Sequence, residues 1–158
     1  MCWRDIPQHS PIRPFLRRHG SVGTWVVMKI DVRALGEALT RDLNPELPAG
    51  CWLRCDRVEG WGGVALFMNT AEGSWGGSGL AGMADSVDVH ELPGVVEAIL
   101  DSIQDDVAHA SRGVAWPTDP AAKGPLREPW AKLADGMLSF GYGSRRFGRD
   151  IRLADIIV

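Results

Sequence analysis

The stretch that decides the fold is residues 93–117, PGVVEAILDSIQDDVAHASRGVAWP. Its apolar residues recur three or four positions apart, at Val96, Ile99, Ile103 and Val107. This spacing predicts an amphipathic helix that lays one face on a core. Pro93 suits the first helical turn, and Gly113 suits the end of a helix. We therefore expect a helix over residues 93–110, followed by a short strand over residues 114–116.

The opposite face of this predicted helix is acidic. It carries Glu97, Asp101, Gln104, Asp105 and Asp106. Asp101 and Asp105 are one turn apart, and like charges at this spacing cost a few tenths of a kcal/mol. A solvated face explains the pattern without a site, whereas a basic partner would relieve the repulsion.

Charge is divided unevenly along the chain. The net charge is about +3 in residues 1–20, about −9 in residues 21–110 and about +3 in residues 111–158. There is no Lys or Arg between Arg57 and Arg112. An acidic surface of this kind suits a basic protein and is poorly suited to a nucleic acid or an anionic membrane.

Length and composition indicate one soluble domain. The chain has 158 residues, of which 45% are apolar and 23% are charged, which is ordinary for a globular protein. Residues 1–20 combine prolines with arginines and are expected to form an extended arm. The globular domain is expected to span residues 21–158. Whether the arm packs on its own domain or on another chain is left open.

The first residues contain no apolar signal segment, and no apolar run is long enough to span a bilayer. Three cysteines without a disulfide pattern agree with a reducing compartment. We therefore expect a cytoplasmic protein with no membrane partner.

The remaining helices and strands follow from local patterns. Residues 24–30 are typical of a strand, and Asp31 is a good N-cap for a second amphipathic helix over residues 32–43. Residues 51–58 and 64–68 predict a hairpin whose second strand is central. After this hairpin we expect a Gly- and Ser-rich loop over residues 70–82. A short strand near residues 87–89 should follow it.

The C-terminal third predicts a second hairpin. Residues 130–133 and 137–142 flank Asp135-Gly136, the residue types of a tight turn, although a short helix over residues 126–134 is a competing prediction. The apolar C-terminus is expected to be either a last strand or an edge offered to a partner. The predicted fold is therefore α+β: a mainly antiparallel sheet of about five or six short strands with the helices 32–43 and 93–110 packed on one face.

No cofactor or metal signature stands out. The spacing G-x-G-x-x-G occurs at Gly77, Gly79 and Gly82, but the expected loop context and the following acids do not suit a pyrophosphate. Cys51 and Cys55 lie on one predicted strand, and the four histidines are scattered. We expect no cofactor and no metal site, and we interpret these two thiols as structural.

Two alternatives to a binding protein remain. In the first, a small enzyme, Asp105, Asp106 and His109 act as acid and base, since Asp105 and His109 share a helix face. A histidine in the last helical turn also interacts favourably with the helix dipole, which requires no site.

The second alternative is binding of a single-stranded nucleic acid. Aromatic and arginine side chains are mixed between residues 140 and 147, and the candidate residues are Tyr142, Arg145, Arg146 and Phe147. The segment matches the RNA-recognition motif only in part, and the acidic composition argues against nucleic acid.

The sequence favours a non-catalytic, cytoplasmic protein-binding or assembly subunit that presents an acidic face to a basic partner. Such a protein could be an assembly component or an immunity-type inhibitor, with another protein or further copies of itself as partner. The candidate contact residues are Trp61, Trp75, Asp101, Asp105 and Asp106. The tryptophans would supply buried area and the acids would steer the partner.

Overall fold

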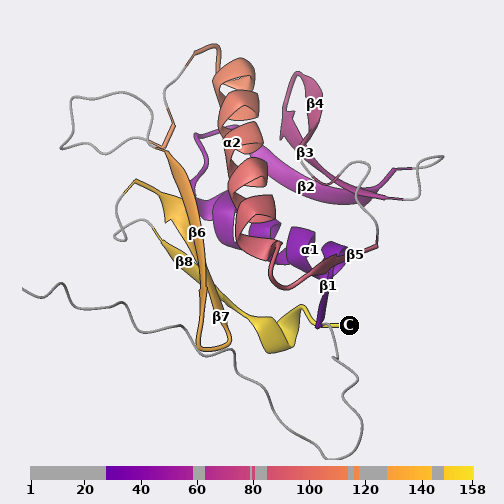
Figure 1. Cartoon of the computed structure of the whole chain (residues 1–158). Coiled ribbons are helices and arrows are strands. Elements are labelled where there is room, and N and C mark those ends of the chain that lie inside the picture. Colours follow the sequence, from indigo (N-terminus) through magenta and orange to yellow (C-terminus); the bar gives the residue numbers. More distant parts are fainter. Residues whose placement is uncertain are drawn as a thin grey trace, which may run out of the picture.

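The computed structural model describes residues 28–58, 63–78, 80, 85–113, 116–117, 128–143 and 148–158. Within these residues the chain forms two α-helices and eight β-strands. The α+β class predicted from the sequence is therefore confirmed. The strands do not form the expected single sheet with both helices on one face. They are divided among three small antiparallel sheets (Figure 1).

Each sheet joins strands through antiparallel pairs. The first sheet pairs β1 (Lys29–Asp31) with β5 (Ser86–Asp88). The second has the order β2-β3-β4 and the third has the order β6-β7-β8. The bounds are Trp52–Arg57, Val64–Thr70 and Gly73–Ser78 for β2 to β4, and Pro129–Ala134, Met137–Tyr142 and Arg149–Arg152 for β6 to β8.

Both predicted helices are confirmed. α1 spans Val32–Leu43, and its N-cap Asp31 accepts hydrogen bonds from the backbone N–H groups of Arg33 and Ala34 at 2.8 and 3.1 Å. α2 spans Leu92–Ala110. Beyond its C-cap Ser111, Arg112 and Gly113 take left-handed conformations, with φ of 57° and 89°, and the N–H of Gly113 donates to Ala108 O at 2.7 Å.

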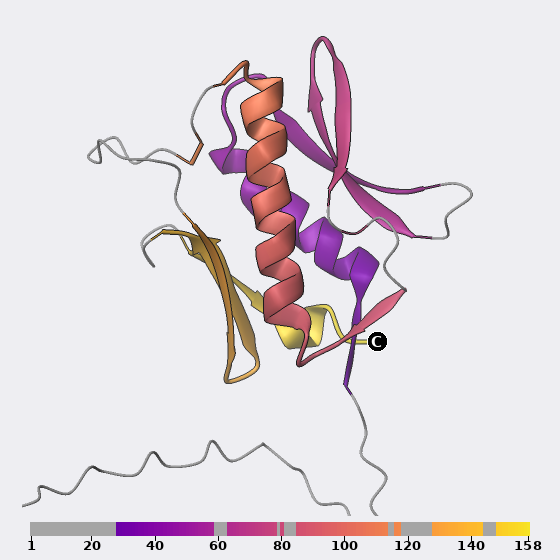
Figure 2. The same ribbon diagram turned by 45° about the horizontal axis from the view of Figure 1, so that its top comes forward.

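α2 is the central element of the molecule. The sheet β6-β7-β8 packs along one side of it, and β3 and β4 contact the other side, while α1 crosses behind it in both views (Figures 1 and 2). The helix buries one continuous face in the core. Its buried residues are Leu92, Val96, Ile99, Leu100, Ile103, Gln104 and Val107.

Both predicted hairpins are present. β3 is the central strand of its sheet, as expected from its apolar sequence. The turn between β6 and β7 places Asp135 and Gly136 at positive φ, 51° and 76°, which fits the twist of the adjoining strands. The competing helix over residues 126–134 is therefore wrong over the part that is described, since Pro129–Ala134 is a strand.

Two local predictions are corrected. The loop expected over residues 70–82 contains the strand β4, in which Ser74 pairs with Asn69 and Gly73 pairs with Thr70. The low strand propensity of Gly and Ser is overridden because β3 offers a second edge of backbone hydrogen-bonding groups. Trp116, expected in a strand, lies instead in a bend and precedes a cis peptide bond to Pro117.

Side chains from helical segments cover parts of two strand edges. Asn44, in the short 3-10 helix η1 (Asn44–Glu46), accepts from Leu53 N at 2.6 Å and donates to Leu53 O at 3.1 Å. Glu97 on α2 accepts from Ala131 N at 3.0 Å. These contacts satisfy backbone groups on the outer edges of β2 and β6 that would otherwise be open to another strand.

The C-terminal segment packs on β1 of the same chain. Ile156 O accepts from Asp31 N at 2.8 Å, and Val158 N donates to Lys29 O at 3.1 Å. A single bridge pairs Ile30 with Ile157. The apolar C-terminus therefore pairs with β1 through one isolated bridge, outside the named strands, and Val158 itself remains 80% exposed.

Two helical glycines provide a test of the packing. A Cβ atom added to Gly36 on α1 would lie 2.7 Å from Cys55 Sγ and 3.1 Å from Leu80 Cδ1, whereas at Gly94 on α2 it would meet nothing. We expect Gly36→Ala to lower the free energy of unfolding by about 1 kcal/mol or more, in spite of the better helix propensity of alanine.

Gly94→Ala is the matched control, and it should raise the free energy of unfolding by up to ~1 kcal/mol, since only propensity changes. Urea denaturation of both variants measures the difference. Equal effects of the same sign would contradict the close approach of α1 to β2.

Candidate functional site

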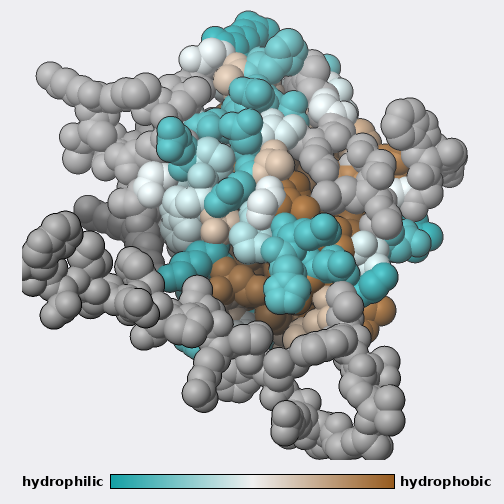
Figure 3. All heavy atoms as spheres, viewed as in Figure 1, coloured by the Kyte–Doolittle hydropathy of each residue, from teal (hydrophilic) through white to brown (hydrophobic). Residues whose placement is uncertain are grey.

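The outer face of α2 carries the predicted acidic contact residues. Asp101 and Asp105 are exposed and lie one turn apart. Neither belongs to an ion pair among the residues that the structure describes. Hydrophilic residues gather over α2 on the side of the molecule seen in Figure 3. The exposed surface of α2 around Asp101 and Asp105 is called the acidic face below.

Two other acids predicted for this face have structural contacts. Glu97 binds the edge of β6 at Ala131 N. Asp106 lies against β4, because a Cβ atom added to Gly76 would be 2.5 Å from Asp106 Oδ2. The φ of Gly76 is 82°, a conformation that favours glycine. The acidic face is therefore narrower than the sequence predicted, and Asp101 and Asp105 are its exposed carboxylates.

The residues of the enzyme alternative do not surround a described pocket. Asp105 and His109 are exposed one turn apart, while Asp106 faces Gly76 of β4. Three hollows formed by described residues are lined by other side chains. None of these three hollows includes Asp105, Asp106 or His109 in its lining, so the enzyme alternative stays a prediction.

Several predicted site residues lie outside the described part of the chain. They are the arm over residues 1–20, Trp61, Arg145, Arg146 and Phe147. Trp75 belongs to β4 and pairs with Met68, but its side chain is not described. The corresponding contact predictions stay predictions.

Tyr142, a predicted nucleic-acid contact, is buried. Its hydroxyl donates to Leu100 O at 2.7 Å, and its ring meets that of Trp116 edge to face, with ring centroids 5.0 Å apart. The ring therefore contributes to the core and does not offer a surface on which a base could stack.

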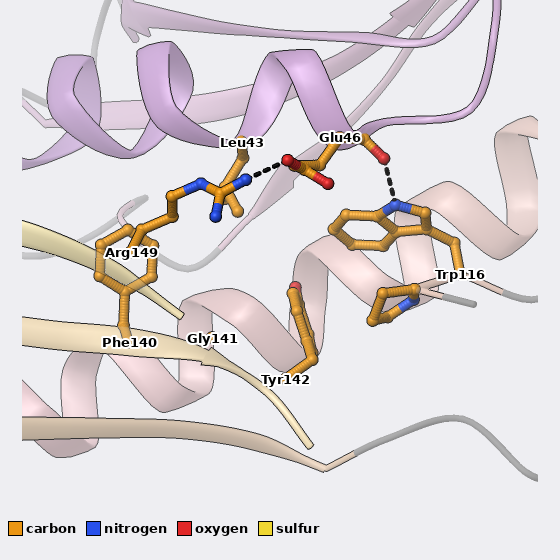
Figure 4. Close-up of a pocket in the computed structure, with 8 residues that line it drawn as sticks. Leu43, Glu46, Trp116, Phe140, Gly141, Tyr142 and Arg149 are labelled. Atoms are coloured by element: carbon orange, nitrogen blue, oxygen red, sulfur yellow. Dashed lines mark hydrogen bonds and ion pairs between the residues drawn. The ribbon is translucent and has the colours of Figure 1, made fainter. Parts of the chain in front are cut away.

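A small hollow lies between α1, the 3-10 helix η1 and the sheet β6-β7-β8. It has a volume of about 100 Å³ and is called the η1 hollow (Figure 4). Its lining residues are Leu43, Glu46, Trp116, Pro117, Phe140, Gly141, Tyr142 and Arg149. They come from four separate segments of the chain, so the tertiary fold alone brings them together.

Each polar side chain that lines the η1 hollow has at least one hydrogen-bond partner within the chain. Trp116 Nε1 donates to Glu46 O at 2.7 Å, and Gln104 Nε2 donates to Trp116 O at 3.3 Å. At the rim, the guanidinium of Arg149 forms an ion pair with the carboxylate of Glu46 (Figure 4). The interior that remains is apolar and aromatic.

Sequence reasoning missed this hollow. Glu46 and Arg149 are 103 positions apart and belong to no recognisable motif. Trp116 was expected in a strand, and Tyr142 was expected on a surface. Aromatic residues beside prolines and glycines were the only signal, and they did not indicate which segments would meet.

The two described cysteines are poor nucleophiles. Burial raises the pKa of the Cys55 thiol to about 11, with a further contribution from Glu37. Burial also raises the pKa of Cys51. Both are therefore neutral thiols at pH 7, in agreement with a structural role.

The described residues contain neither a group of metal ligands nor a membrane-spanning helix. No group of three His, Cys, Asp or Glu side chains there is placed to hold a metal ion. Neither of the two described helices has the length and apolar character required to cross a membrane.

Comparison with protein-family models, curated proteins and solved structures finds no match to this chain.

The buried tyrosine gives a prediction for alkaline pH. Burial, assisted by Asp101, raises the pKa of Tyr142 well above its ordinary value of about 10. Because Tyr142 keeps its proton in the folded state and loses it in the unfolded chain, its contribution to stability should be constant below pH ~10. Above that pH it should fall by up to about 1.4 kcal/mol per pH unit.

Tyr142 is the only tyrosine of the chain, so the ultraviolet absorbance of its phenolate can be followed directly. We expect this absorbance to rise only together with unfolding. Tyr142→Phe should lack this part of the alkaline dependence in urea denaturation between pH 8 and pH 11. Ionisation near pH 10 in a protein that remains folded would contradict the buried position.

Proposed function

We propose that this chain is a non-catalytic, cytoplasmic protein-binding subunit that presents the acidic face of α2 to a basic partner. The observation that carries the proposal is the pair of exposed carboxylates Asp101 and Asp105, one turn apart. They lie in a stretch from residue 58 to residue 111 that contains no Lys or Arg. The partner is a basic protein, either within an assembly or as the target of an immunity-type inhibitor.

Electrostatics supports this assignment. Like charges one turn apart destabilise an isolated helix by a few tenths of a kcal/mol, and a cationic side chain placed between them removes this cost. Surface acids also speed the approach of a basic protein and select against acidic ones. The acids would therefore contribute mainly to the association rate and to partner choice.

Small residues extend the same helix face toward its N-terminus. Gly94 and Ala98 are exposed, and together with Asp101 and Asp105 they follow the spacing of one helix face. The space around Gly94 is open, so packing within the chain does not require glycine there. A partner could approach the helix backbone closely at this end and meet the carboxylates at the other.

Trp61 and Trp75 are proposed as the apolar contacts beside the acids by their sequence context alone, because the structure does not describe their side chains.

Charge reversal tests the proposal. The double variant Asp101→Lys, Asp105→Lys should lower recovery of the native partner at least about tenfold in pull-downs from the host lysate at low salt, because both steering charges become repulsive. Mass spectrometry identifies the captured protein, which should be basic.

The matched control is the double variant Asp85→Lys, Glu128→Lys. It makes the same change in net charge at two exposed acids outside α2, and it should leave recovery nearly unchanged. Equal recovery of the native partner by the two double variants would contradict the acidic-face proposal. Light scattering on the same samples reports whether the partner is a second copy of this chain.

A further inference from the structure

We propose that the η1 hollow binds a small uncharged ring compound that carries one polar group. The hollow measures about 100 Å³, and its apolar and aromatic lining side chains are those of Leu43, Trp116, Pro117, Phe140 and Tyr142. Aromatic and aliphatic walls of this kind attract a ring through burial of apolar surface and through edge-to-face contact.

The interior offers no free hydrogen-bonding group from its aromatic walls. The indole N–H of Trp116 is bonded to Glu46 O, and the hydroxyl of Tyr142 is bonded to Leu100 O. A polar group pushed into this interior would lose its water without gaining a partner, which costs one to several kcal/mol, roughly. The part of a ligand that enters must therefore be apolar.

The rim supplies the polar contacts. The guanidinium of Arg149 has five N–H donors. One of its terminal nitrogens donates to Gly148 O, and the other pairs with the carboxylate of Glu46. Within the described residues, the remaining donors of Arg149 and the second carboxylate oxygen of Glu46 make no further hydrogen bond, so they can bind a hydroxyl or an amide. The Arg149–Glu46 pair is neutral as a whole. A charged ligand would therefore lose its hydration at the rim without gaining an ion-pair partner, and it would bind more weakly than a neutral one.

The size of the hollow limits how deeply a ring can enter. A dry engineered cavity of about 150 Å³ holds benzene completely. The η1 hollow is smaller, so a six-membered ring enters by its edge and leaves the polar substituent at the rim beside Arg149 and Glu46. Affinity for a fragment of this size should be on the order of 1 mM.

The test uses the whole chain labelled with ¹⁵N at its tryptophans, and phenol, benzoate and benzylamine as probes. Phenol should shift the indole resonance of Trp116 in a saturable way. Benzoate and benzylamine should bind at least about fivefold more weakly, since their charge is not compensated at the rim. The resonance of Trp130, which does not line the hollow, is the internal reference.

Three variants assign the effect to the hollow. Leu43→Phe should abolish the phenol shift by filling the space. Glu46→Gln keeps the backbone oxygen that Trp116 needs but leaves Arg149 unpaired, so benzoate should bind about fivefold or more tightly than to the unmodified chain, while phenol changes less than about twofold. Glu37→Gln removes a more exposed ion pair, with Arg33 on α1, and should change neither affinity.

Three outcomes would overturn the proposal. They are no saturable shift of Trp116 with phenol, benzoate binding as tightly as phenol in the unmodified chain, and no gain for benzoate in Glu46→Gln. The last variant changes an exposed side chain and remains folded even if Leu43→Phe does not. The binding measured here does not involve the acidic face, so its failure leaves the protein-binding proposal to its own test.

Discussion

The burial of one face of α2 is the constraint on which the rest of the structure depends. Small sheets of two or three strands are marginal by themselves, because each exposes an apolar face and two edges. α2 provides one apolar surface between the two three-stranded sheets, and both sheets contact it. Removing this surface would expose the inner faces of both sheets at once, so the helix and the sheets are stable only together.

Polar contacts fix the positions of the sheets against the helical segments. Glu97 binds the edge of β6, Asn44 binds the edge of β2, and Tyr142 donates to a carbonyl oxygen of α2. The first two contacts satisfy backbone groups at strand edges, and the third gives the buried hydroxyl of Tyr142 its partner. Apolar packing alone would permit the sheets to slide along the helix. These directional hydrogen bonds select one register.

The two functional proposals are joined by a single residue of the core. The ring of Tyr142 lines the η1 hollow, its hydroxyl binds Leu100 O, and the next residue of α2, Asp101, is exposed on the acidic face. The third sheet therefore holds the helix at the point where the acidic face begins. This rigidity suits a protein whose surface charges must be presented in a fixed arrangement.

Local patterns in the sequence determined both helices, the N-cap at Asp31, the stop at Gly113, the central position of β3 and the turn at Asp135-Gly136. These features depend on spacing and on backbone conformation, which are properties of neighbouring residues. Only the tertiary structure decided that the strands form three sheets, that Gly73–Ser78 is a strand, that Glu97 and Asp106 have partners, and that Glu46, Trp116 and Arg149 meet. Those outcomes depend on which distant segments offer unpaired backbone groups or apolar surface to one another, and a sequence pattern does not contain that information.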